Sequence, residues 1–186
     1  DLLYEKSMKT NSMSLENKEL VLKSYPLVYS VLEQLKFDIS YYIVGNIKVS
    51  ETFIAPVRIE CSDVSKIIGK NITIESIDNK QYTLIYSENG NREIHQYAEE
   101  VILHNTKIKV HMDLRYSTNH TEFPSTVIKF RDLNMLTQAY QNKIIITQKE
   151  RESTVIDISI LEEDQEKGIT FLNKLTENYI HNEINE

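Results

Sequence analysis

The sequence is poor in the residues that mark several common classes of protein. It has one cysteine, no tryptophan, four glycines and three prolines among 186 residues. A single cysteine cannot form an internal disulfide, which excludes the disulfide-rich secreted modules. No apolar run approaches the ~20 residues of a membrane-spanning helix. The phosphate-loop pattern G-x-x-x-x-G-K-[ST] is missing too, because Asn71 follows Gly69 and Lys70.

A positive charge excess is also lacking. Lysine and arginine total 21 against 28 acidic residues, which gives a formal charge of −7. A chain with this balance and no basic stripe is a poor candidate for nucleic-acid binding. A compact fold of this length buries roughly 70% of its unfolded surface, so a core without a disulfide is feasible. Cys61 continues the alternation of Val57 and Ile59, which favours a small buried side chain over a nucleophile.

The first apolar residues recur at helical spacing, with a break at Pro26. Proline is accepted in the first turn of a helix, so we expect a new helix to start there, with Ser24 as its N-cap. Its stripe is formed by Leu27, Val28, Val31, Leu32 and Leu35.

The middle of the chain alternates with the period of two that is typical of strands. Residues 41–53 and 57–61 predict strands, with a bulge or bend at Gly45 and a helical turn at 63–69. Short alternating runs separated by polar turns fill residues 71–113, which indicates an antiparallel sheet or small sandwich.

The last third predicts a strand at 126–132, a helix at 133–142, a short strand at 143–148 and a final strand at 155–161. The final strand is so apolar that we expect both of its faces to be buried. The acidic turn at 162–164 suits a helix N-terminus. The apolar face of the helix that follows is predicted from Ile169, Leu172, Leu175, Tyr179 and Ile180.

These patterns predict an α+β fold: a mixed sheet flanked by N-terminal and C-terminal helices, with a β-rich antiparallel insertion. We expect residues 1–62 and 124–186 to form one base and residues 63–123 to form the insertion. The sequence starts without an initiator methionine, and no stop signal closes the last helix. We therefore expect a fragment of a longer protein.

Side chains with catalytic or metal-binding chemistry do not form a recognisable motif. His104, His111, Asp113 and His120 suit zinc chemically but lack tight ligand spacing. Carboxylate pairs for glycoside hydrolysis can be drawn from Glu99, Glu100, Glu122, Glu162 and Glu163, but among 28 acidic residues such pairs arise by chance. The G-x-S-x-G elbow does not occur. We expect no catalytic, cofactor or metal site, and hence no enzyme activity, in this chain.

Tyrosine is the abundant aromatic residue, with eleven copies. Four in the middle region could stack on sugar rings, although packing within the strands is the favoured interpretation. These glycan-contact candidates are Tyr82, Tyr86, Tyr97 and Tyr116.

Two segments carry a resemblance to a known family. Residues 18–60 resemble the N-terminal half of the periplasmic domain of bacterial polysaccharide co-polymerases, the Wzz-type chain-length determinants. The similarity is greatest to the form fused to tyrosine autokinases in Bacteroides-like bacteria. The C-terminal segment 155–180 resembles the family's strand, acidic turn and "L-N-x-L-x-x-x-Y" helix. The matching residues are Leu27, Val28, Val31, Tyr41, Tyr42 and Pro56 in the first segment and Leu172, Asn173, Leu175 and Tyr179 in the second.

The resemblance implies a non-catalytic scaffold on the periplasmic face of the inner membrane, flanked by membrane helices. Members of the family set the chain length of capsular or exported polysaccharide (exopolysaccharide). The implied partners are other copies of the chain, a polymerase or an outer-membrane export channel, and glycan. A cytoplasmic tyrosine kinase domain belongs to some parent proteins. We expect this chain alone to be a monomer or weak oligomer.

The alternative function is a carbohydrate-binding module that uses the tyrosine-bearing middle sheet. A hydrolase that uses the scattered acidic residues has the least support in the sequence.

Overall fold

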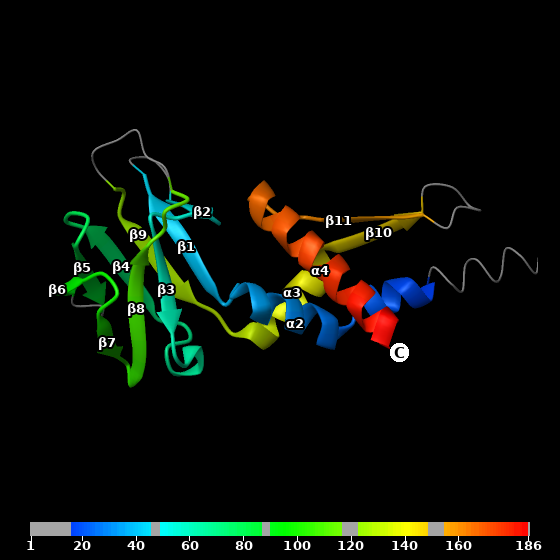
Figure 1. Ribbon diagram of the computed structural model, residues 1–186, viewed down its shortest axis with the longest axis horizontal. Helices are drawn as coiled ribbons and strands as arrows, with labels where there is room; N and C mark the ends of the chain where they lie inside the picture. The colour runs from blue at the N-terminus through cyan, green and yellow to red at the C-terminus, as the bar shows by residue number, and fades with distance from the viewer. Residues whose placement is uncertain (1–15, 46–48, 87–89, 117–122, 149–154, 186) are drawn as a thin grey trace, which may run out of the picture. The chain divides into compact units, whose positions relative to one another are not determined.

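The computed structural model describes residues 16–45, 49–86, 90–116, 123–148 and 155–185. The fold is α+β, as expected, with helices towards both ends and antiparallel sheet between them (Figure 1). The chain divides into two compact units. The helical unit contains the described residues up to Lys36 and those from Leu133 onward, and the β unit is Phe37–Asp132.

The helical unit is assembled from the two ends of the described chain. After a helical stretch over residues 16–22, it contains α2 (Tyr25–Leu35), α3 (Leu133–Lys143), β10 (Ile144–Gln148), β11 (Ile156–Ile160) and α4 (Gln165–Asn185). Helix α2 packs against both α3 and α4. The buried apolar residues of the helical unit are Leu22, Leu27, Val28, Val31, Leu32, Tyr140, Ile144, Phe171 and Leu175.

Helix α2 begins as the sequence predicts. Pro26 lies in its first turn and Ser24 occupies the N-cap position, although the Ser24 side chain makes no capping hydrogen bond. The helix ends at Lys36, which adopts a left-handed conformation with φ 56°. Its N–H bonds back to the Glu33 carbonyl, as at many helix C-termini.

Helix α4 is capped by the acidic turn that precedes it. The Asp164 carboxylate accepts a hydrogen bond from the Lys167 N–H at 3.0 Å, which satisfies one of the free donors of the first turn. At Gly168 an added Cβ would lie 3.4 Å from Ile160 Cγ2. This first turn therefore packs closely on the end of β11.

The buried face of α4 differs from the expected one. Phe171 and Leu175 are fully buried, whereas Ile169 and Ile180 are each 50% exposed. The Phe171 ring packs on the Tyr140 ring of α3 with centroids 4.8 Å apart. Because a phenylalanine buries more apolar area than an isoleucine, this contact turns the Phe171 face inward and leaves Ile169 in solvent.

Strands β10 and β11 form a two-stranded antiparallel ribbon in which Ile144 pairs with Ile160 and Ile146 with Ile158. The prediction that the final strand is buried on both faces is wrong. Side chains along β11 alternate between half-buried and exposed, so one face of the strand, which packs on the rest of the helical unit, is better covered than the other.

The β unit contains two antiparallel sheets. The larger has the order β2-β1-β9-β4-β5-β6 and the smaller has the order β3-β8-β7. The strand bounds are β1 Ile39–Val44, β2 Val49–Thr52, β3 Val57–Cys61, β4 Asn71–Ser76, β5 Gln81–Tyr86, β6 Asn91–Gln96, β7 Glu100–Leu103, β8 Thr106–Met112 and β9 Thr126–Phe130, with a single 3₁₀ turn at Val64–Lys66.

One apolar core joins both sheets of the β unit. Val57, Ile59, Ile108 and Val110 come from the smaller sheet. The larger sheet contributes Ile39, Ile72, Ile74, Tyr82, Leu84, Ile128 and Phe130. The expected small sandwich is therefore present. Cys61 packs on this core half-buried, with Sγ 3.6 Å from Thr106 Oγ1.

The turns of the β unit follow local residue chemistry. The Asp78 carboxylate accepts hydrogen bonds from the N–H groups of Lys80 and Gln81, as aspartate commonly does in turns. His104 and Asn105 both have positive φ, at 48° and 62°, between β7 and β8. Two left-handed residues in succession form the type I′ turn that suits the twist of a hairpin.

The two ends of the β unit meet as neighbouring strands. Ile39 of β1 pairs with Phe130 of β9, and the Arg131 N–H donates to the Asp38 carbonyl at 2.8 Å. The unit therefore leaves and re-enters the rest of the chain at adjacent points.

Three expectations about this region need correction. The units divide at Lys36 and Asp132 rather than at residues 62 and 123, because β3 pairs with β8 and β9 pairs with β4, and both partners were expected to belong to the insertion. Every described strand pair is antiparallel, so the sheet is not mixed. The strand predicted at 41–53 is two strands, β1 and β2, and Gly45 follows the end of the first.

Candidate functional site

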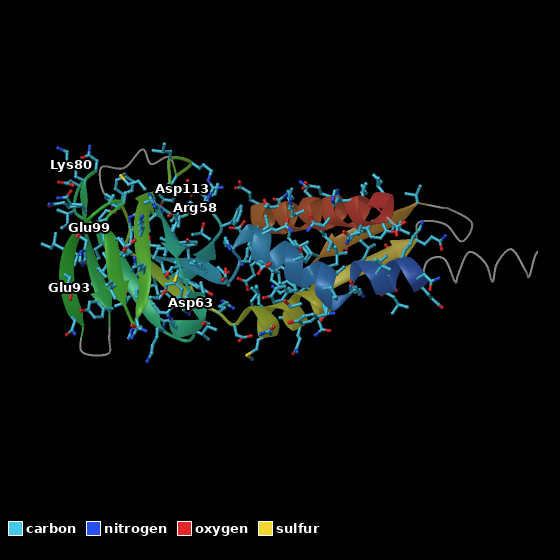
Figure 2. The ribbon with its side chains drawn as sticks, turned by 60° about the horizontal axis from the view of Figure 1, so that its bottom comes forward. Arg58, Asp63, Lys80, Glu93, Glu99 and Asp113 are labelled. Atoms are coloured by element: carbon cyan, nitrogen blue, oxygen red, sulfur yellow. The ribbon has the colours of Figure 1, made fainter. Side chains whose placement is uncertain are left out.

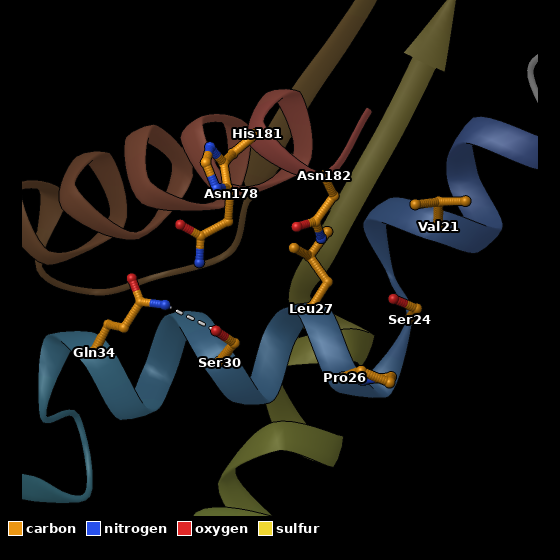
Figure 3. A pocket seen from close by; sticks show the side chains of 9 residues that line it. All are labelled: Val21, Ser24, Pro26, Leu27, Ser30, Gln34, Asn178, His181 and Asn182. Carbon is orange, nitrogen blue, oxygen red and sulfur yellow. Dashed lines mark hydrogen bonds between the residues drawn. The ribbon is translucent and has the colours of Figure 1, made fainter. Parts of the chain in front are cut away.

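One concave feature of the helical unit is a polar groove between α2 and α4, with a volume of about 240 Å³ (Figure 3). We call it the amide groove. Polar side chains from both helices line it: Ser24, Ser30, Gln34, Asn178, His181 and Asn182. Val21, Pro26 and Leu27 add apolar surface. The nine lining residues include no lysine, arginine, aspartate or glutamate.

The groove continues the line along which the two helices pack. Phe171 and Leu175 fill the packed part of α4. Asn178 and Asn182 follow at the same helical spacing, so they lie on an extension of the same stripe. Because amides replace apolar side chains in the last turns, the packing of α4 on α2 gives way to a hydrated groove.

Hydrogen bonding in the groove is only partly internal. The Gln34 Nε2 donates to Ser30 Oγ at 2.8 Å along α2. Within the described residues, the side-chain amides of Asn178 and Asn182 make no hydrogen bond to the protein. Figure 3 shows the Gln34 and Asn178 side chains reaching towards one another from opposite helices. The donors and acceptors of the Asn178 and Asn182 amides are thus open to a ligand or to water.

The residues that carry the family resemblance fall in both units. Leu27, Val28 and Val31 are buried in α2, and Leu175 is buried in α4. Leu172 and Tyr179 are half-buried and Asn173 is exposed. Burial raises the pKa of the Tyr179 hydroxyl. The remaining matches, Tyr41, Tyr42 and Pro56, lie in the β unit.

Tyr41, Tyr42 and Pro56 each make identifiable contacts. The Tyr41 hydroxyl accepts a hydrogen bond from the Ile59 N–H at 3.0 Å, which joins β1 to β3. Tyr42 donates to the Glu51 carboxylate at 3.0 Å and accepts from Arg131. The buried Pro56 accepts from the Asp113 N–H at 2.9 Å.

The four tyrosines predicted to contact glycan do not form an exposed aromatic platform. Tyr82 is fully buried in the core of the β unit, so it cannot be a glycan contact, and packing within the strands, the favoured interpretation, is correct for this residue. Burial raises its pKa. Tyr97 is half-buried against the same core, with its ring 5.2 Å from that of Tyr82. Tyr86 packs on the core and donates to Glu93, whereas Tyr116 is half-buried after β8. Tyr82 and Tyr86 are covered because they lie, with Leu84, on the face of β5 that packs on the core.

The acidic residues considered for catalysis are engaged in structural contacts. Glu162 is nearly buried, with a side chain 8% exposed. It accepts hydrogen bonds from the Tyr140 hydroxyl at 2.8 Å and Lys143 Nζ at 3.1 Å. Glu99 accepts from the Gln96 N–H at 2.8 Å, which lowers its pKa. Glu122 lies outside the described residues.

The histidines considered as metal ligands are not gathered at one point. His104 lies in the β7–β8 turn, and His111 lies on β8 with its Nε2 3.5 Å from a Glu60 carboxylate oxygen. His120 is outside the described residues. Within the described part of the chain, no group of three or more histidine, cysteine or acidic residues has the geometry of a metal site.

Asp113 instead forms ion pairs within the β unit. Its side chain is 5% exposed and accepts hydrogen bonds from Arg115 Nη2 at 2.6 Å and Nε at 3.0 Å. Arg58 Nε is 3.9 Å away (Figure 2). The hydrogen bonds from Arg115 hold the pKa of the Asp113 carboxyl below its ordinary value. This ion pair between the buried Asp113 and the exposed Arg115 links β8 to the turn that follows it.

Sequence reasoning missed the amide groove and the group formed by His95 of β6 with two glutamates. His95 Nε2 lies 3.1 Å from a Glu93 oxygen, and its Nδ1 lies 3.6 Å from Glu99. No local motif predicts this group. The groove had a detectable signal, because Asn178 and Asn182 continue the apolar stripe of α4.

No protein-family model matches the chain, and no curated protein matches it. Among solved structures, two crystal forms of FlgL from Xanthomonas campestris each align with a TM-score of 0.29 and 9% sequence identity. Each alignment covers 75% of this chain and 40% of the FlgL chain. This chain therefore aligns with less than half of FlgL, and so low a TM-score carries no argument about fold or function. Among the described helices, none combines the length and apolar character needed to cross a bilayer.

Proposed function

We propose that this chain is a non-catalytic periplasmic scaffold of a polysaccharide chain-length regulator or of a capsular or exopolysaccharide export protein. It acts by self-association and by contacts with a polymerase, an export channel or the glycan. The parent protein is held at the inner membrane by flanking segments. A tyrosine kinase domain is compatible with this role but is not required by it.

The observation that carries the proposal is the packing of α2 against α4. These helices contain the two most distinctive stretches of the family resemblance, and they come from opposite ends of the described chain. Leu27, Val28 and Val31 of α2 and Leu175 of α4 are all buried in one helical core. A resemblance in two distant segments has a physical basis when both build the same unit.

Self-association is supported by apolar side chains left in solvent on α4. Ile169, Ile180 and Ile184 are 50%, 50% and 76% exposed. Their spacing places them on one face of the helix, apart from the buried Phe171 face. Clustered exposed apolar residues are typical of interaction surfaces. The partner that fits this role is a second copy of the chain, which offers the same apolar face in return.

The contacts of the acidic residues favour structural roles. Glu162 stabilises the junction of α3 and α4, and Asp113 anchors Arg115. The alternative, a carbohydrate-binding module that uses the tyrosines of the middle sheet, loses Tyr82 to the core. The leading proposal therefore keeps glycan contact but does not assign it to that tyrosine set.

The proposal is tested in the full-length parent protein, in cells that produce its polysaccharide. Ile180→Asp places a charge on the exposed face of α4. We expect it to weaken crosslinked oligomers and to shift the length distribution of the polymer on gels. Ile94→Asp is the matched control, because Ile94 is also a solvent-exposed isoleucine, at 65%, but lies on β6.

Circular dichroism of both purified variants establishes that they fold. If removal of the whole protein leaves the polymer length unchanged, the role in chain-length control is wrong. If Ile180→Asp and Ile94→Asp assemble equally well, the α4 face is not the association surface.

A further inference from the structure

The amide groove has the chemistry of a site for an uncharged, hydroxyl-rich ligand. Three side-chain amides, Gln34, Asn178 and Asn182, each provide a carbonyl acceptor and two N–H donors. Ser24 and Ser30 add hydroxyl groups that can donate and accept. Sugar hydroxyls also donate and accept, so an array of this kind can satisfy neighbouring hydroxyl groups without a change of protonation.

The nine lining residues include no lysine, arginine, aspartate or glutamate. This composition affects which ligand charge the groove favours. An anionic or cationic ligand that enters the groove gives up hydration, and no side chain of fixed opposite charge lines the groove to replace it. A neutral ligand loses less, and its hydroxyls can exchange water for the open amides of Asn178 and Asn182. The groove therefore favours neutral over charged ligands.

The apolar part of the lining suits the carbon face of a sugar ring. Leu27 is buried and lines the groove together with Asn182. Pro26 and Val21 extend this surface. Small-molecule sites typically combine apolar walls with a few polar groups that fix orientation.

The volume of the groove limits the size of the ligand. About 240 Å³ is below the ~300–1,000 Å³ of pockets for drug-sized molecules. An extended peptide in a helical groove is normally held by apolar anchors, and a strand-like peptide adds to a sheet edge. Neither arrangement matches a short groove lined by amides. One monosaccharide unit matches it in both size and chemistry.

We propose that the amide groove between α2 and α4 binds a single neutral sugar unit of a glycan, held by Gln34, Asn178 and Asn182. The inference rests on the proposed function and assigns its glycan contact to the helical unit rather than to the middle sheet. A site this small and open gives weak binding, with a Kd on the order of 1 mM or above.

The test is a titration of the full chain, isotope-labelled, with glucose, galactose, mannose and N-acetylglucosamine, followed by NMR. At least one sugar is expected to give saturable shifts at Ser30, Gln34, Asn178 and Asn182. The double variant Asn178→Ala/Asn182→Ala should weaken binding at least tenfold. Asn142→Ala is the matched control, because Asn142 is an exposed asparagine of α3 that does not line the groove, and it should bind as the original chain does.

Glucuronate and a tetra-alanine peptide are titrated in parallel. Stronger binding of either one at the groove overturns the proposal, as does the lack of saturable shifts with all four neutral sugars. Equal binding by the double variant and the Asn142→Ala control also overturns it. These outcomes leave the polymer-length experiment untouched, so failure of the sugar site can be distinguished from failure of the scaffold role.

Discussion

The two units of this chain bury their cores by different means. The β unit is one continuous segment, Phe37–Asp132, with two sheets around one apolar core. The helical unit joins segments from both sides of it, and its core depends on contacts of α2 with α3 and α4. The continuous unit contains everything that its core needs, whereas the discontinuous unit requires two distant parts of the chain to meet.

The pairing of β1 with β9 shows how that meeting becomes feasible. Ile39 lies opposite Phe130, so the residues that follow α2 and precede α3 start from adjacent strands. Bringing two distant chain segments together costs loop-closure entropy. In the folded β unit that closure is already made, because β1 and β9 are paired. We therefore infer that the helical unit depends on the β unit and that the reverse dependence is weak.

The most extensive effect, which reaches both units, is expected from Leu84→Ala. Leu84 is fully buried in the β-unit core, and truncation of a buried leucine costs about 2–5 kcal/mol. Loss of the β unit should also release the ends that close the helical unit. Hydrogen exchange of the full chain should therefore show lost protection in both units.

Phe171→Ala tests the same dependence by destabilising the helical unit. The change removes the ring packed on Tyr140 and should cost the helical unit about 3–5 kcal/mol. Protection should fall in α2, α3 and α4, while β4, β5 and β9 keep theirs. Ile169→Ala is the control on the same helix, because Ile169 is half exposed. Equal loss of protection in both units would contradict the one-way dependence.

A smaller effect, with a defined pH dependence, is expected from Asp113→Asn in the β unit. The Asp113 pKa is lowered by its hydrogen bonds from Arg115, so its ionised form stabilises the fold. That stabilisation is complete above the ordinary aspartate pKa and is lost as pH falls through the lowered value. At pH 7 the variant should lose roughly 1.5–3 kcal/mol of stability.

Urea unfolding at a series of pH values measures the difference between Asp113→Asn and the original chain. The difference should shrink as pH falls below about 4. Asp157→Asn changes an exposed aspartate of β11 and is the control. A difference that stays constant from pH 7 to pH 3 would show that the charge of Asp113 does not stabilise the fold.

Local patterns predicted much of this structure. Pro26 placed the start of α2, the acidic turn placed the start of α4, and the period of two located β4 to β8. These features depend on residues close in sequence. The unit boundary was missed because it depends on the pairing of β9 with β4 and of β3 with β8, whose residues are far apart along the chain.

Side-chain burial was harder to predict than the elements themselves. Ile169 and Phe171 are both apolar, and only the contact with Tyr140 decides which of them faces inward. The amide groove was overlooked because Asn178 and Asn182 are ordinary polar residues of a helix until α2 lies opposite them. Tyr82 remained a candidate glycan contact beside the favoured interpretation of strand packing, because the alternation of β5 does not reveal which of its faces is covered.

The smallest effect separates two tyrosines that share one core. Tyr82 is fully buried, and its hydroxyl has no hydrogen-bond partner among the described residues, whereas the neighbouring Tyr97 hydroxyl lies 2.7 Å from Ser76 Oγ. A buried polar group without a partner costs about 1–3 kcal/mol. Tyr82→Phe removes that group without leaving a cavity, so we expect it to raise the free energy of unfolding by about 1 kcal/mol. Tyr97→Phe breaks a hydrogen bond and should lower it by a similar amount. Urea unfolding of the two variants measures the pair of changes, and a loss of stability in both would mean that the Tyr82 hydroxyl has a stabilising partner after all.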